Sequence, residues 1–216
     1  MINGGIDMAG YVSEAVIKRL PGYYRHLREL EATDVVQISS QELGRRMQLT
    51  ASQIRQDISC FGGFGRQGYG YNVSELKGHI GEILGIDKPH SMIIIGAGNV
   101  GTAVALYPSF AKEGFRTVAV FDKDTQKVGK KIGAQTIRPV AELEEFLMSN
   151  EVSIAVLAVP APDAQHMMER LSALGVKAVW NFAPTDLKPA KDVIVVNVHL
   201  SDSLQILSYK MAHRDD

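Results

Sequence analysis

A glycine-rich segment in the middle of the chain has a spacing suited to binding a diphosphate. Gly96, Gly98 and Gly101 form the pattern G-x-G-x-x-G directly after the apolar run at residues 92–95. The first glycine of such a pattern permits a tight turn, the second lets the main chain approach a pyrophosphate, and the third lets the next helix pack closely on the strand. The N–H groups and the positive dipole at the N-terminus of that helix attract phosphate. The spacing therefore predicts a dinucleotide loop made of Gly96, Ala97, Gly98, Asn99, Val100 and Gly101.

An acidic residue follows this loop at the distance that a dinucleotide-binding fold requires. Asp122 lies 21 residues after Gly101, at the end of the apolar run at residues 117–121. A carboxylate at this place can accept hydrogen bonds from both hydroxyls of a ribose and would repel a 2′-phosphate, which predicts NAD(H) as the cofactor. The neighbouring Lys123 weakens this preference. In the alternative interpretation, the glycines only form a tight turn and Asp122 caps the turn that follows.

A second group of residues, in the first half of the chain, has the types and spacing that read DNA. Residues 41–47 and 50–58 are expected to form two short helices joined by a tight turn, which is the helix-turn-helix arrangement. Thr50, with Gln53 three residues later, fits a capping box and places the start of the second helix. Ile54 and Ile58 should face the core of this domain. The side chains that could then enter a major groove are Ser52, Gln53, Arg55, Gln56 and Ser59.

Glycines alternate with aromatic residues directly after the second of these helices. This pattern, at residues 61–71, suits a hairpin whose backbone approaches another molecule closely, and after a helix-turn-helix we expect it to be a wing. Residues 45–71 hold four arginines and one aspartate, a local charge of +3 that would supply phosphate contacts. The alternative is a solvated helical face beside a glycine loop. The residues assigned to DNA from this region are Arg45, Arg46, Phe64, Arg66, Gln67 and Tyr69, with Arg66 and Gln67 at the tip for a minor groove.

The composition restricts where such sites can act. The chain has 216 residues, 45% of them hydrophobic, and a net charge of -1, so any anion-binding surface must be a local patch. The first residues do not resemble a charged leader, and the apolar stretches are too short to span a bilayer. We therefore expect a cytoplasmic protein with no membrane partner. The single cysteine, Cys60, allows no internal disulfide, and we expect it to be a small buried core residue rather than a thiol sensor.

The elements that must position these residues divide the chain into two halves. Before residue 85 the pattern is helical, and Pro21 is expected to separate two helices rather than to lie inside one. The segment 85–90 carries a proline and charges, and we expect it to be a linker. After residue 91, short apolar runs alternate with helical patterns, which predicts an α/β domain with a Rossmann-like, doubly wound parallel sheet. The apolar runs lie at residues 92–95, 117–121, 154–159, 178–180 and 193–196.

Residues 12–214 resemble the Rex family of redox-sensing transcriptional repressors. The resemblance implies an N-terminal winged helix-turn-helix domain (1–85), a C-terminal Rossmann domain (86–200) and a C-terminal helix (201–216) that is exchanged between the subunits of a homodimer. It also implies that the protein binds palindromic operator DNA and is released when NADH replaces NAD+. The resemblance rests on KRLP at 18–21 with Tyr24 and Arg25, QIRQDISCFG at 53–62, GYGYNV at 68–73, the loop at 96–101 and NFAP at 181–184.

A few positions depart from the pattern of that family. The family usually has a basic residue where this chain has Gln56, and often a second one at Gln67, so we expect a shifted operator preference or affinity. Some members have a relay of arginine, tyrosine and aspartate at the domain interface. Asp202 is three residues beyond the third of these positions, and whether it substitutes for the aspartate is left open. The corresponding residues here are Arg25, Tyr107 and His199, the last standing where the aspartate would be.

A response to redox state requires a contact that differs between NAD+ and NADH. The two coenzymes differ at the nicotinamide ring, which in a Rossmann fold lies over the carboxyl ends of the strands. The loops expected there are mainly apolar, so they should accept the neutral reduced ring more readily than the cation. In the alternative interpretation, their prolines stiffen loops and Phe182 belongs to the core. We expect NADH to turn the Rossmann domains and move the wings out of register with the half-sites. The residues assigned to this end of the cofactor are Val159, Pro160, Asn181, Phe182, Ala183 and Tyr107.

Two other functions compete with this interpretation. An NAD-dependent dehydrogenase would need a general acid or base, and neither His166 nor His199 has an evident carboxylate partner in the sequence. No substrate domain is left once residues 1–85 are assigned to DNA, so we expect no enzymatic activity. The other alternative is a DNA-binding regulator that senses a different adenine nucleotide or a CoA derivative. No cluster of histidines and cysteines has the spacing of a metal site.

Overall fold

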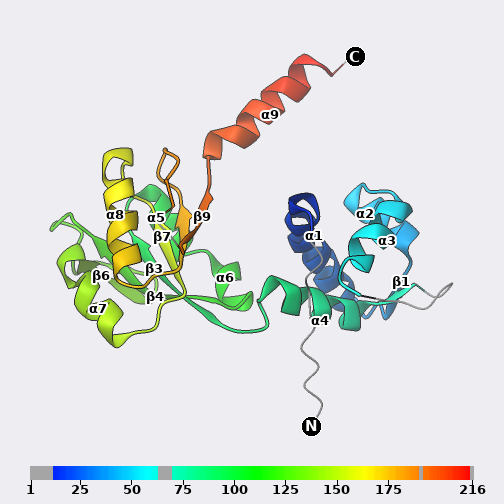
Figure 1. Ribbon diagram of the computed structural model, residues 1–216, viewed down its shortest axis with the longest axis horizontal. Helices are drawn as coiled ribbons and strands as arrows, with labels where there is room; N and C mark the ends of the chain where they lie inside the picture. The colour runs from blue at the N-terminus through cyan, green and yellow to red at the C-terminus, as the bar shows by residue number, and fades with distance from the viewer. Residues whose placement is uncertain (1–11, 63–69, 190–191, 215–216) are drawn as a thin grey trace, which may run out of the picture. The chain divides into compact units, whose positions relative to one another are not determined.

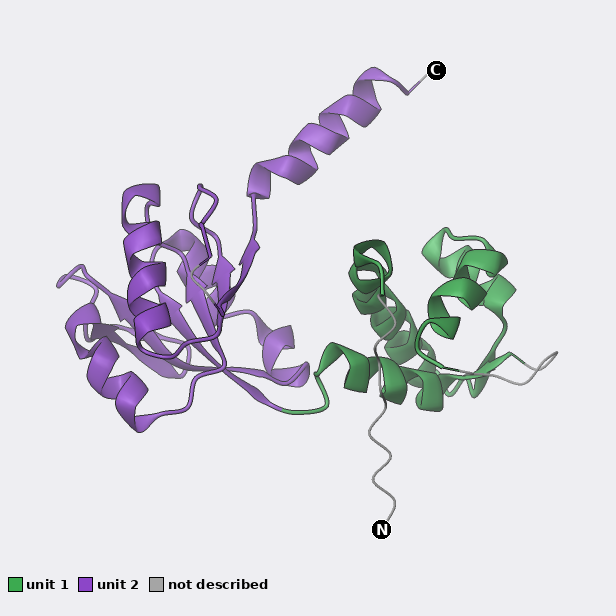
Figure 2. Cartoon of the chain, in the orientation of Figure 1, with its two compact units in different colours: residues 1–88 green, residues 89–216 purple. Residues whose placement is uncertain are grey.

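The computed structural model describes residues 12–62, 70–189 and 192–214 of the chain. The chain divides into two compact units, unit 1 at residues 1–88 and unit 2 at residues 89–216 (Figure 2). The division falls in the loop that follows helix α4 (Val73–Leu84), which Gly85 ends in a left-handed conformation with φ of 68°. Each unit has hydrophobic clusters of its own, one in unit 1 and two in unit 2.

The first helix of unit 1 continues without a break through its proline. α1 (Glu14–Glu31) begins after Ser13, whose side chain accepts a hydrogen bond from the N–H of Val16. The expectation that Pro21 separates two helices is wrong. Pro21 is exposed, the apolar stripe of the helix continues on both sides of it, and burial of that stripe outweighs the hydrogen bond that proline cannot donate. The stripe consists of Val16, Leu20, Tyr23, Leu27 and Leu30.

Two short helices form the predicted helix-turn-helix. α2 (Ser40–Met47) is capped by Ser39 and α3 (Ala51–Ser59) by Thr50, and each cap oxygen accepts an N–H from the residue three positions further on. Between the two helices, Gln48 has a φ of 57°, which ends α2 and turns the chain tightly. The prediction of this motif is confirmed, and Thr50 begins the second helix where the capping pattern placed it.

A small sheet ties the segment before α2 to the segment after α3. β1 (Gln37–Ile38) and β2 (Tyr71–Asn72) pair antiparallel, with Ile38 opposite Tyr71. Gly70 has no room for a side chain, because a Cβ atom there would lie 2.4 Å from the carbonyl oxygen of Ile38. α4 then packs on α1 and completes the core. Ile54 and Ile58 lie in this core as predicted, together with Leu20, Tyr23, Leu27, Leu43, Val73, Leu76 and Ile80.

Unit 2 is built on a seven-stranded sheet with the order β5-β6-β4-β3-β7-β8-β9. All neighbouring strands are parallel except the edge pair, in which β5 (Lys131–Ile132) runs antiparallel to β6 (Gln135–Pro139). The six parallel strands have the order of a Rossmann fold, which confirms the predicted doubly wound sheet. The other strands are β3 (His90–Ile95), β4 (Phe115–Asp122), β7 (Ile154–Leu157), β8 (Ala178–Asn181) and β9 (Ile194–Asn197).

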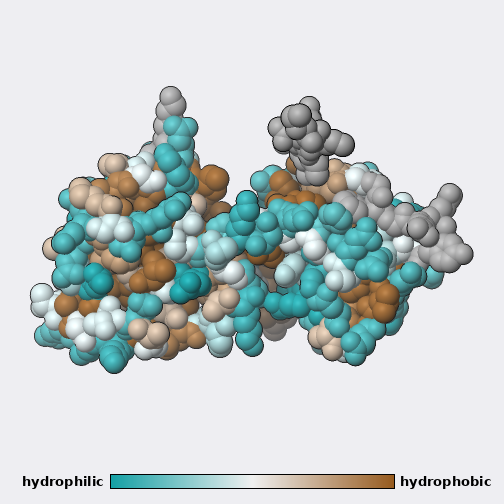
Figure 3. All heavy atoms as spheres, turned by 90° about the horizontal axis from the view of Figure 1, so that it is seen from below, coloured by the Kyte–Doolittle hydropathy of each residue, from teal (hydrophilic) through white to brown (hydrophobic). Residues whose placement is uncertain are grey.

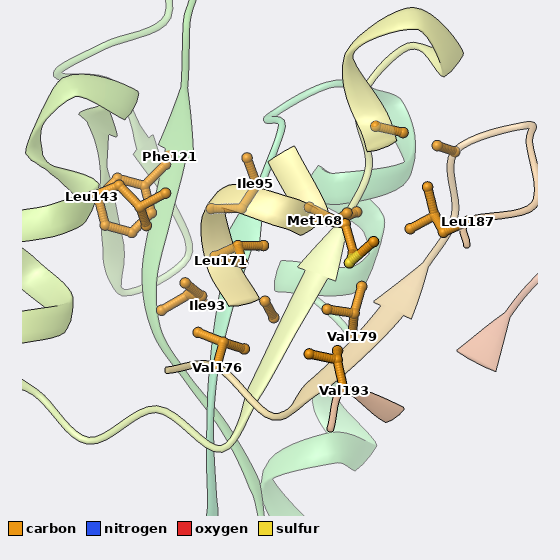
Figure 4. Packing of buried hydrophobic residues seen from close by; sticks show 14 of the residues in the cluster. Ile93, Ile95, Phe121, Leu143, Met168, Leu171, Val176, Val179, Leu187 and Val193 are labelled. Atoms are coloured by element: carbon orange, nitrogen blue, oxygen red, sulfur yellow. The ribbon is translucent and has the colours of Figure 1, made fainter. Parts of the chain in front are cut away.

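Helices cover both faces of this sheet. On one face α8 (Ala161–Ala173) contributes Met168 and Leu171, and α7 (Leu143–Ser149) contributes Leu143 (Figure 4). On the other face lie α5 (Asn99–Ala105) and α6 (Pro108–Lys112). Successive strand residues point to opposite faces, so the two hydrophobic clusters share the strands between them. In β3, for example, Ile93 and Ile95 belong to the first cluster, and Met92 and Ile94 to the second.

The edge strands β5 and β6 were not expected from the sequence. The burial of β6 alternates, with Ile137 buried between exposed neighbours, because β6 lies near the sheet edge and has one face in solvent. Its sequence therefore lacks the continuous apolar run by which the other strands were found. A 3-10 turn, η1 (Val140–Glu142), connects β6 to α7.

The chain ends in a helix whose apolar residues are exposed. α9 (Leu200–Ala212) follows β9 and extends away from the sheet (Figure 1). Leu200, Leu204, Leu207 and Met211 are between 52% and 70% exposed, although they recur at helical intervals on one side.

On the face of each unit seen in Figure 3, hydrophilic residues predominate between smaller hydrophobic groups. None of the helices in the described part of the chain is long and apolar enough to cross a membrane.

Candidate functional sites

The glycine loop connects β3 to α5, and each of its three glycines occupies a different kind of position. Gly96 has a φ of 101°, and a Cβ atom there would lie 2.3 Å from the carbonyl oxygen of Ala158. A Cβ atom at Gly101 would lie 1.8 Å from the carbonyl oxygen of Gly96, so a side chain would push the helix off the strand. At Gly98 a Cβ atom would meet nothing within 4 Å. The fold therefore requires the first and third glycines, whereas the second leaves open space over the backbone.

Asp122 holds this loop in place from the end of β4. Its carboxylate accepts the N–H of Ala97 at 2.7 Å and that of Asp124 at 2.8 Å, and Lys127 Nζ lies 3.2 Å from Oδ2. Burial raises the pKa of Asp122, but the hydrogen bonds from Asp124, Ala97 and Lys127 outweigh it, so the pKa lies below its ordinary value of 3.8. The capping role that the sequence offered as an alternative is thus observed. The carboxylate also lines a pocket beside the glycine loop.

A pocket of about 840 Å³ opens at the carboxyl ends of the parallel strands. Its volume lies in the range of about 300–1,000 Å³ typical of cofactor sites, and its position is the switch point where the sheet order reverses. The structure brings together nine of the residues predicted for the cofactor, namely Gly96, Gly98, Asn99, Val100, Asp122, Lys123, Val159, Pro160 and Phe182. Pro162 and Pro184, from the two apolar loops expected at the nicotinamide, line it as well.

Five predicted cofactor residues do not line this pocket. Ala97 and Gly101 shape the loop from behind, and Ala183 is 1% exposed. Asn181 is fully buried, and its side-chain amide bonds the carbonyl of Thr185, Oδ1 of Asn197 and the N–H of Ala183. Tyr107 caps α6 beyond the end of α5, is 54% exposed and packs on Phe110. Asn181 therefore stabilises the loop after β8, and Tyr107 lies outside the pocket.

The sequence-based site omitted several residues that the fold brings to the pocket. Asp163 and His166 lie one turn apart at the start of α8, directly after β7, and a doubly wound topology places such a turn beside the glycine loop. This topological rule could have identified them, but their sequence forms no motif. Asp163 forms an ion pair of 2.7 Å with Lys123. The other omitted residues are Ile95, Asp124, Lys127, Val140, Ala158 and Met167.

His199 has a carboxylate partner, contrary to the sequence-based expectation. Its Nε2 lies 2.9 Å from Asp186 Oδ1, thirteen residues earlier in the chain. No sequence motif indicated this pair, because Asp186 lies in the loop between β8 and β9 and is brought near His199 by the pairing of these strands. Neither residue lines the pocket, so the pair is not placed to act on a bound cofactor.

The exposed side of α3 presents most of the side chains predicted to read DNA. Ser52, Arg55, Gln56 and Ser59 are exposed, and Gln53 is half-buried. Arg55 Nη1 donates to Ser40 Oγ at 3.1 Å, which steadies its guanidinium beside α2. The predicted wing residues Phe64, Arg66, Gln67 and Tyr69 lie outside the described part of the chain.

Arg45 and Arg46 share one carboxylate on α2. Glu42 accepts two hydrogen bonds from Arg45, at 2.9 and 2.8 Å, and one from Arg46 at 3.0 Å. These hydrogen bonds lower the pKa of Glu42 below its ordinary value of 4.5, so the carboxylate stays charged at neutral pH. The positive charge of this surface is therefore smaller than the count over residues 45–71 suggested. A phosphate must compete with Glu42 for both arginines.

An ion pair anchors the recognition helix α3 to α1. Asp57 is 3% exposed and accepts Nε and Nη2 of Arg19 at 2.7 and 2.8 Å, and the hydroxyl of Tyr23 at 2.9 Å. The one acidic residue of α3 is thus turned inward and neutralised. The outward face of the helix is left to polar and basic groups that DNA can approach.

The expectation that Cys60 is buried is wrong. Cys60 is exposed at the C-terminal cap of α3, and its thiol lies 3.3 Å from the carbonyl oxygen of Gln56. Ile58 and Phe61 fill the core positions on either side, so the helix turns the cysteine outward.

Comparisons with known proteins match both halves of the chain to known families. Residues 11–59 match the family described as putative DNA-binding protein N-terminus, and residues 87–185 match the CoA binding domain. The redox-sensing transcriptional repressor Rex of Caldanaerobacter subterraneus subsp. tengcongensis is 52% identical over 200 residues, which cover 93% of this chain and 89% of that protein. The chain belongs to the Rex family. The Rex protein of Clostridium perfringens is 48% identical over 204 residues, covering 94% of this chain and 96% of its own.

Solved structures of Rex relatives match nearly the whole chain. A crystal structure of RSP in complex with β-NAD+ and operator DNA has a TM-score of 0.89 and 50% identity, and the match covers 95% of each chain. RSP in complex with β-NADH has a TM-score of 0.87 and 48% identity, covering 95% of this chain and 97% of the other. The predicted fold class and the predicted family are confirmed.

Proposed function

We propose that this chain is a redox-sensing repressor that binds palindromic operator DNA as a homodimer and leaves it when NADH occupies its pocket. The observation that carries the proposal is the presence, in one chain, of a glycine-loop pocket and an exposed recognition helix. The Rex relatives are named redox-sensing transcriptional repressors, and RSP has been solved with both kinds of ligand.

The pocket fits NAD(H). Open space over Gly98 lets a diphosphate reach the backbone N–H groups of the loop, and Asp122 stands at the strand end where a ribose is read. The bound cofactor supplies a nicotinamide ring whose charge depends on its oxidation state. Val159 and Phe182, with the prolines of their loops, would surround that ring with apolar groups that favour the neutral form. The resulting difference in affinity between NADH and NAD+ is what a redox switch requires.

On the DNA side, we assign the major groove to α3 and the backbone to the basic groups around it. Arg55 and Gln56 are exposed side chains that can form paired hydrogen bonds with guanine and adenine. Ser52, Gln53 and Ser59 lie on the same helix, while Arg45 and Arg46 on α2 would contact phosphates. We keep the assignment of the wing tip to Phe64, Arg66, Gln67 and Tyr69 as part of this proposal.

The homodimer is supported by apolar surface that one chain leaves uncovered. Four apolar residues of α9 are exposed on one side, and beside β8 and β9 a cavity of about 340 Å³ is lined mainly by apolar residues such as Trp180 and Val196. Burying such a stripe in a partner subunit would remove it from water. We accordingly propose three parts, a DNA-binding domain at 1–85, an NAD(H) domain at 86–200 and an exchanged helix at 201–216, acting in the cytoplasm.

A dehydrogenase is disfavoured by the arrangement of the histidines. His166 lines the pocket, but among the described residues no carboxylate is bonded to it, whereas the paired His199 lies outside the pocket. The Rex relatives are moreover named as repressors.

Fluorescence anisotropy with a labelled palindromic operator tests the proposal. The full-length protein is titrated onto the DNA at a fixed total concentration of NAD+ plus NADH, with the reduced fraction as the variable. We expect the apparent operator Kd to rise as the reduced fraction rises, and a scrambled duplex to bind weakly throughout. Equal operator affinity with either coenzyme at saturation would overturn the redox role, and binding of both duplexes alike would overturn the operator role.

A further inference from the structure

The charged side chains of the nucleotide pocket form two ion-paired groups. Lys127 Nζ lies 3.2 Å from Asp122 and 3.9 Å from Asp124, and Lys123 Nζ lies 2.7 Å from Asp163 Oδ2. Two ammonium groups thus face three carboxylates among the described lining residues, which gives the pocket a net charge of -1. Each lysine that could attract an additional phosphate is already held by a carboxylate.

The pair formed by Lys123 and Asp163 is not a local contact. Lys123 directly follows β4, whereas Asp163 lies in the first turn of α8 after β7. β3 lies between these two strands, so the pair bridges two strand spacings, or about 9–10 Å of sheet, beside the glycine loop. Asp163 therefore reaches across from the other side of the loop to hold Lys123.

Position 123 matters because, in this fold, the residues at the end of this strand contact the adenosine ribose of the dinucleotide. A carboxylate there bonds the 2′-hydroxyl of the adenosine ribose, whereas a nearby basic group accommodates a 2′-phosphate. This chain places both at successive positions. Asp122 is 6% exposed and its charge is opposed by Lys127, while the side chain of Lys123 is 69% exposed. Repulsion by Asp122 is therefore partly cancelled, and an unpaired Lys123 would be free to bind a phosphate.

We propose that Asp163 is a specificity-determining residue, which makes the pocket select NAD(H) over NADP(H) by holding the Lys123 ammonium away from a ribose 2′-phosphate. The proposal rests on the proposed function, because it concerns the same pocket. Asp163 raises the pKa of Lys123 through their hydrogen bond, in agreement with a pair in which both groups are charged. A 2′-phosphate would have to displace Asp163 from Lys123 and would lie beside a carboxylate that remains charged.

Asp163→Asn in the full-length protein tests this, because it removes the charge and keeps the shape. The net charge of the lining becomes zero and Lys123 is released for a charge-assisted hydrogen bond. We expect the ratio of NADPH affinity to NADH affinity, measured by isothermal titration calorimetry, to rise about five- to tenfold at low salt. The gain should shrink at about 1 M salt, where the Debye length is about 3 Å.

Two further variants make the result decisive. Lys123→Gln added to Asp163→Asn should abolish the gain, because the phosphate then has no ammonium to bind. Glu144→Gln removes a carboxylate of α7 that lies outside the pocket and pairs at 3.2 Å with Arg170 of α8. This variant should leave the ratio unchanged. An unchanged ratio in Asp163→Asn, or a gain that survives loss of Lys123, overturns this proposal alone. A wild-type protein that binds neither coenzyme overturns the proposed function as well.

Discussion

Gly98 and Gly101 lack a side chain for different reasons, although both belong to the same loop. A Cβ atom at Gly101 would overlap the carbonyl oxygen of Gly96, whereas one at Gly98 would meet nothing within 4 Å. Gly98 also has a φ of -83°, which any residue adopts. The protein fold therefore does not require a glycine at position 98. A ligand that approaches the backbone closely does require one, because a side chain would occupy its space.

Gly98→Ala should consequently separate binding from stability. We expect its free energy of unfolding to stay within about 0.5 kcal/mol of the wild type. Overpacking of about 1–3 kcal/mol against the bound diphosphate should weaken NADH binding roughly ten- to hundredfold. Chemical denaturation and calorimetry measure the two quantities. As a control, Gly101→Ala should lower both stability and binding, and unchanged NADH affinity in Gly98→Ala would show that the diphosphate lies elsewhere.

Tyr23 gives unit 1 a pH dependence in the alkaline range. Burial and the hydrogen bond to Asp57 raise its pKa above the ordinary value of 10.0. The unfolded chain then loses this proton at a lower pH than the folded chain does, so the stabilisation is complete below pH 10 and declines as the pH rises above it. Tyr23→Phe should be about 1–3 kcal/mol less stable at pH 8, and the difference should narrow above pH 10. Chemical denaturation at pH values from 8 to 11 measures the unfolding free energy of both proteins, and an equal dependence on pH in the two would contradict this prediction. Tyr107→Phe, which changes an exposed tyrosine, is the control.

Among the elements, α1 includes the residue that the sequence interpretation placed at a helix boundary. Pro21 removes one backbone hydrogen bond from the interior of the helix, so Pro21→Ala should raise the unfolding free energy by about 1–3 kcal/mol. Gly22→Ala, whose Cβ atom would meet only the Met47 side chain at 3.5 Å, is the matched control and should gain about 0.5–1 kcal/mol. If Pro21→Ala instead lowers stability or operator affinity, a bend at Pro21 is what lets Arg19 and Tyr23 reach Asp57.

Helices and central strands were predictable because their sequence signals are local. Capping residues such as Thr50 and uninterrupted apolar runs such as residues 92–95 determine an element from its own residues. The β5–β6 hairpin and the unbroken α1 were missed, because their form depends on what lies beside them. β6 lies second from the sheet edge and has one face in solvent, and α1 continues through Pro21 because its apolar stripe is buried in the core of unit 1.

In the candidate site, too, the residues with a local sequence signal were predicted and those that depend on neighbouring elements were missed. The glycine loop and Asp122 were found because one motif contains their spacing, and Asp163 and His166 were missed because only the parallel sheet brings α8 beside that loop. Asn181 was assigned to the cofactor from its motif, yet its side chain is fully buried and bonded within the fold. A motif therefore identifies a segment well, but which side chain of the segment faces the ligand depends on the packing around it.

At the scale of the whole molecule, the two sites must be coupled reciprocally. If NADH weakens operator binding by a given factor, operator DNA must weaken NADH binding by the same factor, whatever the path of the change. We expect that factor to be about 5–150, the usual range for coupling free energies of 1–3 kcal/mol. NADH titrations with and without saturating operator, compared with operator titrations with and without NADH, measure both sides. Unequal factors would mean that a further ligand or a change in assembly takes part.

Assembly itself is expected to depend on the exposed stripe of α9. Leu204 and Leu207 lie at its centre and are 67% and 52% exposed in the single chain. Burying each fully is worth about 1.5–3 kcal/mol, so replacing both by glutamate should dissociate the dimer at micromolar concentration. Sedimentation velocity then measures a monomer, and affinity for a palindromic operator falls far more than affinity for one half-site. Gln205→Glu adds a charge on the opposite side of the helix and should leave a dimer. A double variant that remains dimeric would place the subunit interface on the sheet rather than on α9.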